Sequence, residues 1–222
     1  MKEKRYVILS VLICTLAMCL VDAVIKPPYL YKSLSKIVVF LIIPYIYVAR
    51  YDKEAFKKLF TPNKSNLKIS IPLGILVFSV VMIAYFICRQ FIDLGVIQNI
   101  LTSNADINAE NFIFVAIYIS FFNSLLEEFF FRGYAFLIVK KYSSRKFAYI
   151  FSAFMFSFYH VGMTRGWFNI LIYILALVGL FIGGCIFNYL NEKCDNIYSS
   201  WIVHMCANFA INTIGLLMFG II

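Results

Sequence analysis

Two histidines and a pair of adjacent glutamates are the residues of this 222-residue chain whose types and spacing suit chemistry. Glu127 and Glu128 lie within one long apolar stretch. His160 lies in the next apolar stretch, after a short polar loop, and His204 lies near the C-terminus. A charged side chain in an apolar span is energetically expensive, so its presence needs a reason. Carboxylates and imidazoles are the groups that most often move protons in enzymes. The pattern therefore predicts acid–base chemistry in an apolar environment.

The spacing around the glutamates separates their roles. Glu128 and Arg132 are four residues apart, so they share a helix face and can form an ion pair that lowers the cost of burying both. Glu127 is offset by about 100° around the helix and has no basic residue at i+4, so we expect it to be free to act as a general base on water. Asn123, one turn earlier, can orient its carboxylate. The alternative is an ion cluster that only locks helices together.

The two histidines are expected to reach the same layer as Glu127. At 1.5 Å per residue, Glu127, His160 and His204 lie about 13–21 Å from the basic loops that mark one edge of the membrane. A single membrane histidine is usually a hydrogen-bond partner between helices, whereas two histidines with two glutamates favour a common site. His204 and Asn208 are four residues apart and present two hydrogen-bond donors side by side, which can hold a developing oxyanion.

The composition defines the elements that must position these residues. Hydrophobic residues make up 63% of the chain and charged residues 14%, which excludes a soluble globule, a disordered chain and, because the apolar runs are continuous, a transmembrane barrel. The sequence predicts one all-α, polytopic helical membrane domain over residues 1–222, with about seven transmembrane helices of about 20 residues. An eighth helix is expected if the region from Arg89 to Asn111 holds a short interfacial one. Gly179 and Gly183 have the GxxxG spacing that predicts close helix contact. The expected spans are at about residues 6–25, 33–49, 69–88, 112–139, 147–161, 168–190 and from 197 onward.

The net charge of +9 is distributed between the apolar runs and forms no patch, so nucleic acid is not an expected partner. About 14 bases fall on the side of the N-terminus, which predicts a cytoplasmic N-terminus. The side chains counted on the opposite side are Lys26, Lys32, Lys36, Arg89 and Arg165. The six cysteines show no CxxC or zinc-finger spacing. A composition rich in Lys, Ile, Phe and Tyr indicates an AT-rich bacterial genome and hence a bacterial plasma membrane.

Three motifs follow one another in a fixed order. Glu127 to Arg132 reads EExxxR, Phe156 to His160 reads FxxxH, and His204 to Asn208 reads HxxxN. This pattern resembles the CAAX-protease and bacteriocin-processing (CPBP) family of intramembrane proteases, which includes the type II CAAX prenyl endopeptidases. The resemblance covers about residues 112–212, whereas the helices of residues 1–111 carry no motif that matches.

The resemblance implies hydrolysis of a peptide bond in a membrane cavity. It makes Glu127 the principal base, Glu128 its supporting acid and Arg132 the cation that holds the acidic cluster. It also implies that His160 binds and polarises the water.

The same resemblance makes His204 and Asn208 the oxyanion site. The family has been described both as metalloproteases and as glutamate-dependent proteases. Zinc is one alternative, with Glu127, His160 and His204 as its ligands. The HExxH pattern is absent, and we favour water activation without a metal or other cofactor.

The expected function is therefore that of an intramembrane endopeptidase that hydrolyses a hydrophobic or membrane-associated peptide. Its expected partners are membrane lipid and a peptide or small protein substrate, in bacteriocin or pheromone processing or in self-immunity. A small secreted peptide is favoured over a prenylated CAAX protein. Two alternatives stay open: a non-catalytic membrane adaptor or immunity protein on the same fold, and a proton-coupled transporter. A transporter is expected to show paired repeats and broken helices, which the sequence lacks.

Overall fold

A computed structural model describes residues 2–51, 53–61 and 64–222, and it gives side chains for these residues except 2–4, 51, 55–56 and 64–66. Helices contain 87% of the described residues, and no strand occurs among them. The bilayer core offers no water to backbone N–H and C=O groups, so a spanning segment must satisfy them within itself, as a helix does. The predicted all-α, polytopic architecture is confirmed.

Six helical segments are long and apolar enough to cross a membrane. The segment predicted at 147–161 forms helix α10 (Arg145–Met163), which lies in the same bundle but is not one of the six. Two bases open α10, and its serine, tyrosine and histidine side chains lower its hydropathy, so its place in the bundle depends on packing. The six segments are Arg5–Ile25, Tyr29–Arg50, Leu67–Phe91, Phe112–Tyr142, Ile170–Cys194 and Tyr198–Met218.

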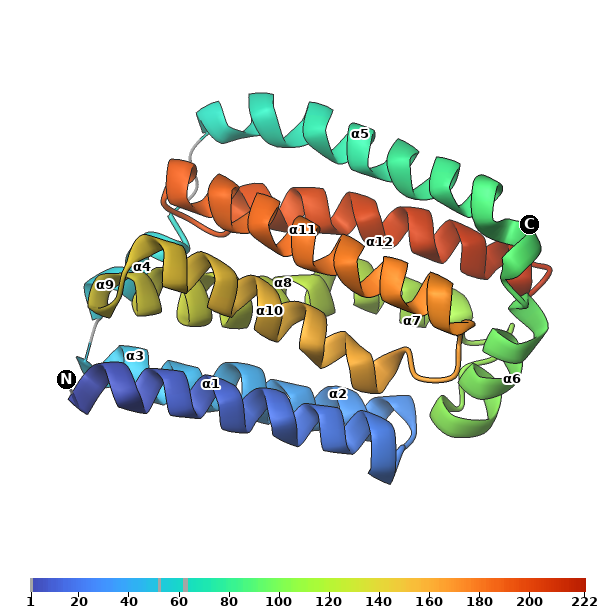
Figure 1. The fold of residues 1–222 in the computed structure, drawn as a ribbon, viewed down its shortest axis with the longest axis horizontal. Helices are drawn as coiled ribbons and strands as arrows, with labels where there is room; N and C mark the ends of the chain where they lie inside the picture. The colour runs from blue at the N-terminus through green and yellow to red at the C-terminus, as the bar shows by residue number, and fades with distance from the viewer. Residues whose placement is uncertain (1, 52, 62–63) are drawn as a thin grey trace.

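The N-terminal half places one helical hairpin along one edge of the bundle and a long helix along the other (Figure 1). The hairpin turns at Lys26, which has left-handed backbone, and at the two prolines that follow, which interrupt the helix. The polar region after residue 89 does hold a further helix, α6. The elements are α1 (Lys2–Leu20), π-helical η1 (Val21–Ile25), α2 (Tyr29–Ile37), π-helical η2 (Val38–Ile42), α3 (Ile43–Tyr51), α4 (Lys53–Leu59), α5 (Lys64–Cys88), the 3-10 turn η3 (Arg89–Phe91) and α6 (Leu94–Ala105).

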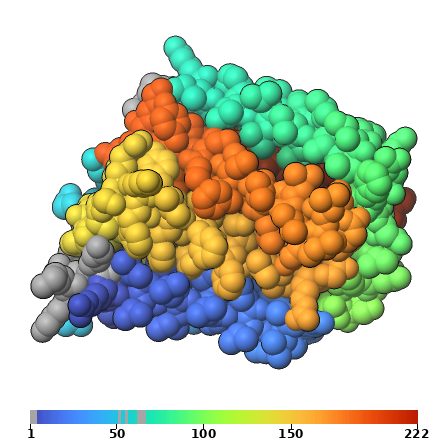
Figure 2. Space-filling view, in the orientation of Figure 1, coloured from blue at the N-terminus to red at the C-terminus, as the bar shows by residue number. Residues whose placement is uncertain are grey.

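The C-terminal half begins with a continuous helix that runs through the centre of the bundle, and every residue of its segment η5 is buried. Helix α12 packs against α5, and α10 packs against both α11 and α1. Figure 2 shows α10 and α11 filling the face between the N-terminal hairpin and α5. The elements are α7 (Phe112–Tyr118), π-helical η4 (Ile119–Asn123), α8 (Ser124–Glu127), π-helical η5 (Glu128–Ile138), α9 (Val139–Tyr142), α10, α11 (Ile170–Cys194) and α12 (Tyr198–Met218).

The π-helical segments were not foreseen from a regular 3.6-residue spacing. Segment η2 ends two residues before Pro44. Proline has no N–H to donate to the carbonyl of Phe40 four residues earlier, so the local hydrogen-bond ladder has to change. Segments η4 and η5 flank the four residues of α8, which end at Glu127. Wide π turns inside α-helices are frequent at functional sites, and here they bracket the predicted catalytic carboxylates.

The basic loops gather at one end of the bundle. Helices α4 and α9 lie at the same end as the N-terminal end of α1, whereas α6 and the C-terminus lie at the other (Figure 1). Glu192 partly neutralises this basic end, 3.1 Å from Lys140 and 2.7 Å from Arg145. Lys2, Lys4 and Lys64 are among the basic residues counted on this side, and their side chains lie outside those that the structure describes. The described basic residues of these loops therefore lie at one end of the bundle, as the predicted distribution of charge across the membrane requires.

The close helix contact predicted for Gly179 and Gly183 is not made by these residues. A methyl group added at either would meet no described atom within 4 Å. The contact is made by the neighbouring Gly184, where an added methyl group would lie 3.0 Å from Cα of Ala153 on α10. The GxxxG spacing identified the right helix but the wrong face, because spacing alone does not show which side faces a neighbour.

We expect Gly184→Leu to destabilise the protein by about 1–3 kcal/mol, because the larger side chain must push α10 and α11 apart. Gly183→Leu is the matched control, since it adds the same atoms one residue earlier into open space. The thermal midpoints of the two purified variants in detergent, followed by circular dichroism, measure the difference. Equal midpoints would contradict the α10–α11 contact.

Candidate active site

The central helix carries both predicted glutamates into the interior. Glu127 is the last residue of α8 and Glu128 the first of η5, and the two are 2% and 0% exposed. Helix α12 brings His204 between them. Its Nδ1 lies 2.9 Å from Oε1 of Glu128, and its Nε2 lies 3.8 Å from Oε2 of Glu127. One imidazole therefore lies between the two carboxylates and is hydrogen-bonded to that of Glu128.

His160 closes another side of this cluster from α10. Its Nδ1–H donates to the carbonyl oxygen of Phe156 at 2.8 Å, which leaves Nε2 for other partners. The Phe156 ring lies 4.7 Å from the His160 ring and 5.9 Å from the His204 ring. The two imidazoles thus share the Phe156 ring as a neighbour. The structure thus brings together three of the apolar stretches that the motifs occupy.

The expectation that Glu127 has no basic partner is wrong. Lys36 on α2 is 3% exposed, and its Nζ lies 2.8 Å from Oε1 of Glu127. The same ammonium donates to Oδ1 of Asn123 at 2.6 Å, and Nδ2 of Asn123 donates to Oε1 of Glu127 at 3.0 Å. The spacing argument considered only partners on the same helix, and Lys36 precedes Glu127 by 91 residues. The sequence did hold an indication of this contact, because Lys36 lies inside the apolar span predicted at 33–49 and a buried lysine needs an anion. The count of basic residues on the two sides of the membrane treated it as a loop residue instead.

Arg132 is placed as its spacing predicted. Its Nε lies 3.5 Å from Oε2 of Glu128, and both side chains are fully buried. The guanidinium also lies over two aromatic rings, 4.0 Å from the centre of Phe156 and 4.8 Å from that of Phe187. Desolvated cation–π contacts of this kind contribute about 2 kcal/mol. Arg132 therefore balances the charge of Glu128 and joins α10 and α11 to the central helix.

The asparagines of α12 bind the backbone of the central helix. Nδ2 of Asn208 donates to the carbonyl oxygen of Ile119 at 3.2 Å. Nδ2 of Asn212 donates to the carbonyl oxygen of Ala116 at 3.1 Å and to Oγ of Ser120 at 2.9 Å. A side-chain amide has two N–H hydrogens, so Asn208 keeps one that is not used by this contact. The amides tie α12 to the π segment η4, just before the glutamates.

The residues considered as zinc ligands do not fit a metal site in this arrangement. Within the described part of the chain, no three or more His, Cys, Asp or Glu side chains are grouped to hold a metal ion. The ammonium of Lys36 occupies Oε1 of Glu127 and would repel a divalent cation placed there. The chemistry below is therefore derived from protein side chains alone.

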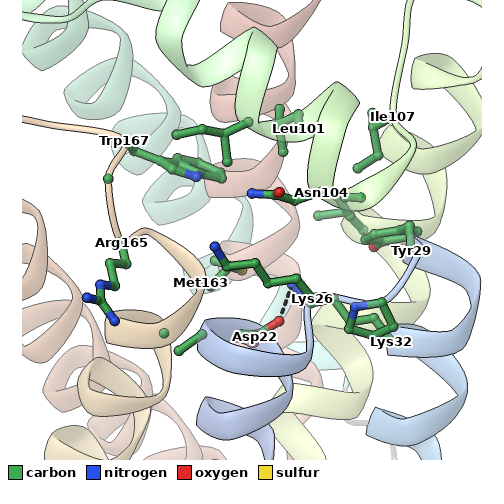
Figure 3. Close-up of a pocket in the computed structure, with 17 residues that line it drawn as sticks. Asp22, Lys26, Tyr29, Lys32, Leu101, Asn104, Ile107, Met163, Arg165 and Trp167 are labelled. Carbon is green, nitrogen blue, oxygen red and sulfur yellow. Dashed lines mark ion pairs between the residues drawn. The ribbon is translucent and has the colours of Figure 1, made fainter.

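A pocket of about 500 Å³ lies at the end of the bundle opposite the basic loops. Figure 3 shows its lining, which combines the basic side chains of Lys26, Lys32 and Arg165 with apolar ones such as Trp167. Asp22, the acid of this lining, is paired with Lys32 at 2.5 Å. The pocket therefore has apolar walls and an excess of positive charge.

The pocket adjoins the buried cluster but does not contain it. Lining residues Lys32 and Ile119 each lie one helical turn before a cluster residue, Lys36 and Asn123 respectively. A third lining residue, Gly162, follows His160 by two positions. A helical turn rises about 5.4 Å, so the pocket floor and the cluster are neighbouring layers.

Residues 109–210 match the family model described as type II CAAX prenyl endopeptidase Rce1-like. The resemblance predicted from the three motifs is confirmed. The Rce1-like segment covers a little under half of the chain and contains all six predicted site residues, whereas Lys36 lies outside it. No curated protein and no solved structure matches the chain. Over this segment the chain is similar to type II CAAX prenyl endopeptidases, and six of its helices are long and apolar enough to cross a membrane.

Within the Rce1-like segment, we expect Arg132→Met to destabilise the protein by about 3–5 kcal/mol, because Glu128 would lose the cation of a buried pair. Adding Glu128→Gln should recover part of that loss by removing the uncompensated charge. Arg145→Met, which removes a largely exposed guanidinium, is the control and should change stability little. Chemical unfolding in detergent measures the three variants and the wild type, and wild-type stability of Arg132→Met would contradict the buried pair.

Proposed function

We propose that the chain hydrolyses peptide bonds within the membrane, with Glu127 as the general base. The observation that carries the proposal is one imidazole, His204, placed between two buried glutamates in the segment that matches a protease family. A structural ion pair needs one acid and one base. The second glutamate and the second histidine, His160, supply proton-transfer groups beyond that need.

The two oxygens of Glu127 have different surroundings, which supports a specific mechanism. Oε1 accepts hydrogen bonds from Lys36 and Asn123, whereas Oε2 faces Nε2 of His204 at 3.8 Å. That separation is too long for a direct hydrogen bond but lets one water contact both atoms. In the proposed reaction, Oε2 takes a proton from this water while the water oxygen attacks the peptide carbonyl carbon. The same carboxyl group then gives the proton to the leaving amine nitrogen.

The developing oxyanion needs hydrogen-bond donors within reach of the attacked carbonyl group. Glu128 accepts from Nδ1–H of His204, and a carboxylate in that position stabilises an imidazolium that donates from Nε2. The remaining N–H of Asn208 lies one turn further along α12. We assign the oxyanion site to these two residues, with His160 holding the water against Glu127.

The pocket supports a hydrophobic peptide as substrate. Its walls are apolar, its excess charge is positive, and it opens at the end opposite the basic loops. With a cytoplasmic N-terminus in a bacterial plasma membrane, that end faces outward. We therefore propose a small secreted peptide, such as a bacteriocin or pheromone precursor, that reaches the site from the outer side.

The enclosure of the cluster favours one second candidate. Glu127, Glu128 and Arg132 are at most 2% exposed, which also suits a non-catalytic adaptor or immunity protein in which the ions only join helices. Such a protein needs the charge balance of the cluster but no proton transfer. Substitution of the proposed base distinguishes the two.

Glu127→Gln keeps the shape of the side chain but cannot accept a proton, so we expect cleavage to fall by about 10²–10⁴-fold. The assay uses purified protein in detergent and a library of quenched fluorescent peptides with apolar residues on both sides of each bond. Glu192→Gln is the matched control, since it changes a glutamate that is paired at the basic end.

Three results of this assay would redirect the proposal. Wild-type turnover by Glu127→Gln would refute the base, and no cleavage of any peptide by the wild-type protein would favour the adaptor. Loss of wild-type cleavage on chelation, restored by zinc, would convert the mechanism to a metal-bound water.

The proposed orientation predicts which loops a membrane-impermeant maleimide can reach in intact cells. In a variant without native cysteines, Ser103→Cys on α6 should be labelled directly. Lys141→Cys, in the last turn of α9 at the basic end, should be labelled only after the cells are permeabilised. Both side chains are exposed in the structure, so access depends on the side of the membrane. The reverse labelling pattern would overturn the orientation.

A further inference from the structure

Lys36 is a buried lysine that belongs to none of the three motifs and lies outside the segment matched by the family model. An ammonium taken out of water needs a nearby anion and hydrogen-bond acceptors to offset the loss of hydration. The structure supplies both, from Glu127 and Asn123 on the central helix. The N-terminal half of the chain therefore contributes a charge to the candidate site.

The contacts of Lys36 fix the rotation of the Glu127 carboxylate. Lys36 donates to Oε1 of Glu127 and to Oδ1 of Asn123, and Asn123 donates to that same Oε1. These three hydrogen bonds form a closed ring. Because Oε1 is held twice, rotation about the carboxylate axis is opposed and Oε2 stays directed toward His204.

Aromatic rings hold the ammonium in place. The Lys36 Nζ lies 4.7 Å from the ring centre of Tyr159 and 5.8 Å from that of Phe40. Phe40 in turn stacks on Phe130 of the central helix at 4.1 Å. The neighbouring cation on α2, Lys32, pairs with Asp22. Lys36 is thus the α2 lysine whose position is set by the central helix and α10.

We infer that Lys36 is a positioning residue for the proposed reaction: its ammonium holds Oε1 of Glu127 so that Oε2 faces the reacting water. The inference rests on the proposed function, in which Oε2 is the base. It assigns the N-terminal hairpin, which carries no recognised motif, a direct part in the geometry of the site. Lys36 acts through Glu127 and does not itself contact the reacting atoms.

The test compares Lys36→Met, Lys36→Arg, Glu127→Gln and the double variant Lys36→Met/Glu127→Gln in the same peptide assay. We expect Lys36→Met to lower kcat by about 10²-fold with KM little changed, because a misplaced base slows the chemical step. Lys36→Arg should recover part of kcat. The double variant should be no slower than Glu127→Gln alone, since Lys36 has nothing to position once the base is gone. Lys140→Met, which breaks the lysine–glutamate pair with Glu192, is the control and should keep wild-type kcat.

Infrared spectroscopy gives a readout that does not depend on cleavage. Subtracting the spectrum of Glu127→Gln from that of the wild type isolates the bands of Glu127. Subtracting the double variant from Lys36→Met should give a shifted carboxylate band, and Lys36→Arg, with its own double variant, should return the band toward its wild-type position. This comparison also covers the case in which Lys36→Met folds poorly, because the arginine variant keeps the positive charge.

The outcomes separate the inference from the function on which it rests. Wild-type kcat in Lys36→Met, with Glu127→Gln inactive, would overturn the positioning role and leave the protease proposal standing. Losses that multiply in the double variant would also overturn it, because they show that Lys36 acts independently of Glu127. A shifted band with no cleavage by any variant would support the contact and reject the proposed function.

Discussion

Charge compensation in an apolar interior is the constraint on which this structure depends. Glu127 and Glu128 sit in the middle of a helix whose surroundings offer little water, so each must find its counter-charge within the bundle. Their partners come from three directions: the cations Lys36 on α2 and Arg132 on η5, and the imidazole of His204 on α12. The ion pairs therefore require the N-terminal hairpin and the last helix to close on opposite sides of the central one. A bundle assembled from apolar contacts alone would lack this specification of which helices are neighbours, because lipid is as apolar as most helix faces.

The central helix departs from regular geometry where this compensation takes place. Segments η4 and η5 lie on either side of α8, and their wide turns change which carbonyl oxygens the helix satisfies itself. Carbonyls at Ala116 and Ile119 accept hydrogen bonds from the amides of Asn212 and Asn208. Helix α12 thus does two things with side chains one turn apart: it brings His204 between the glutamates, and it binds the backbone that carries them. The irregular backbone and the amides of α12 therefore meet along the same stretch of the central helix.

How much of this the sequence could predict depends on whether a feature is local. Apolar run length located the spans, and the i, i+4 spacing placed Arg132 beside Glu128, because both depend on residues close in the chain. Helix α10, which forms the segment predicted at 147–161, is less apolar than a free-standing span because much of it is buried against neighbouring helices. Its apolar residues alone therefore did not show whether it crosses the membrane by itself. The partner of Glu127 lies 91 residues away, and no local spacing could show it. The contact at Gly184 was missed for a similar reason: a glycine's role depends on the helix opposite, not on the distance to the next glycine.

The division of the carboxylate oxygens explains why two adjacent glutamates are present. Oε1 of Glu128 binds His204, Oε2 of Glu128 faces Arg132, and Oε1 of Glu127 binds Lys36 and Asn123. Three of the four oxygens thus have a partner, and two of these oxygens bind side chains of other helices, His204 and Lys36. The fourth, Oε2 of Glu127, faces an imidazole at a distance that leaves room for a water. A single glutamate would have to serve both purposes, and rotating to do chemistry would break the contacts that fix its position. With two, one carboxylate anchors α12 and the central helix, and the other has an oxygen left for the proposed reaction.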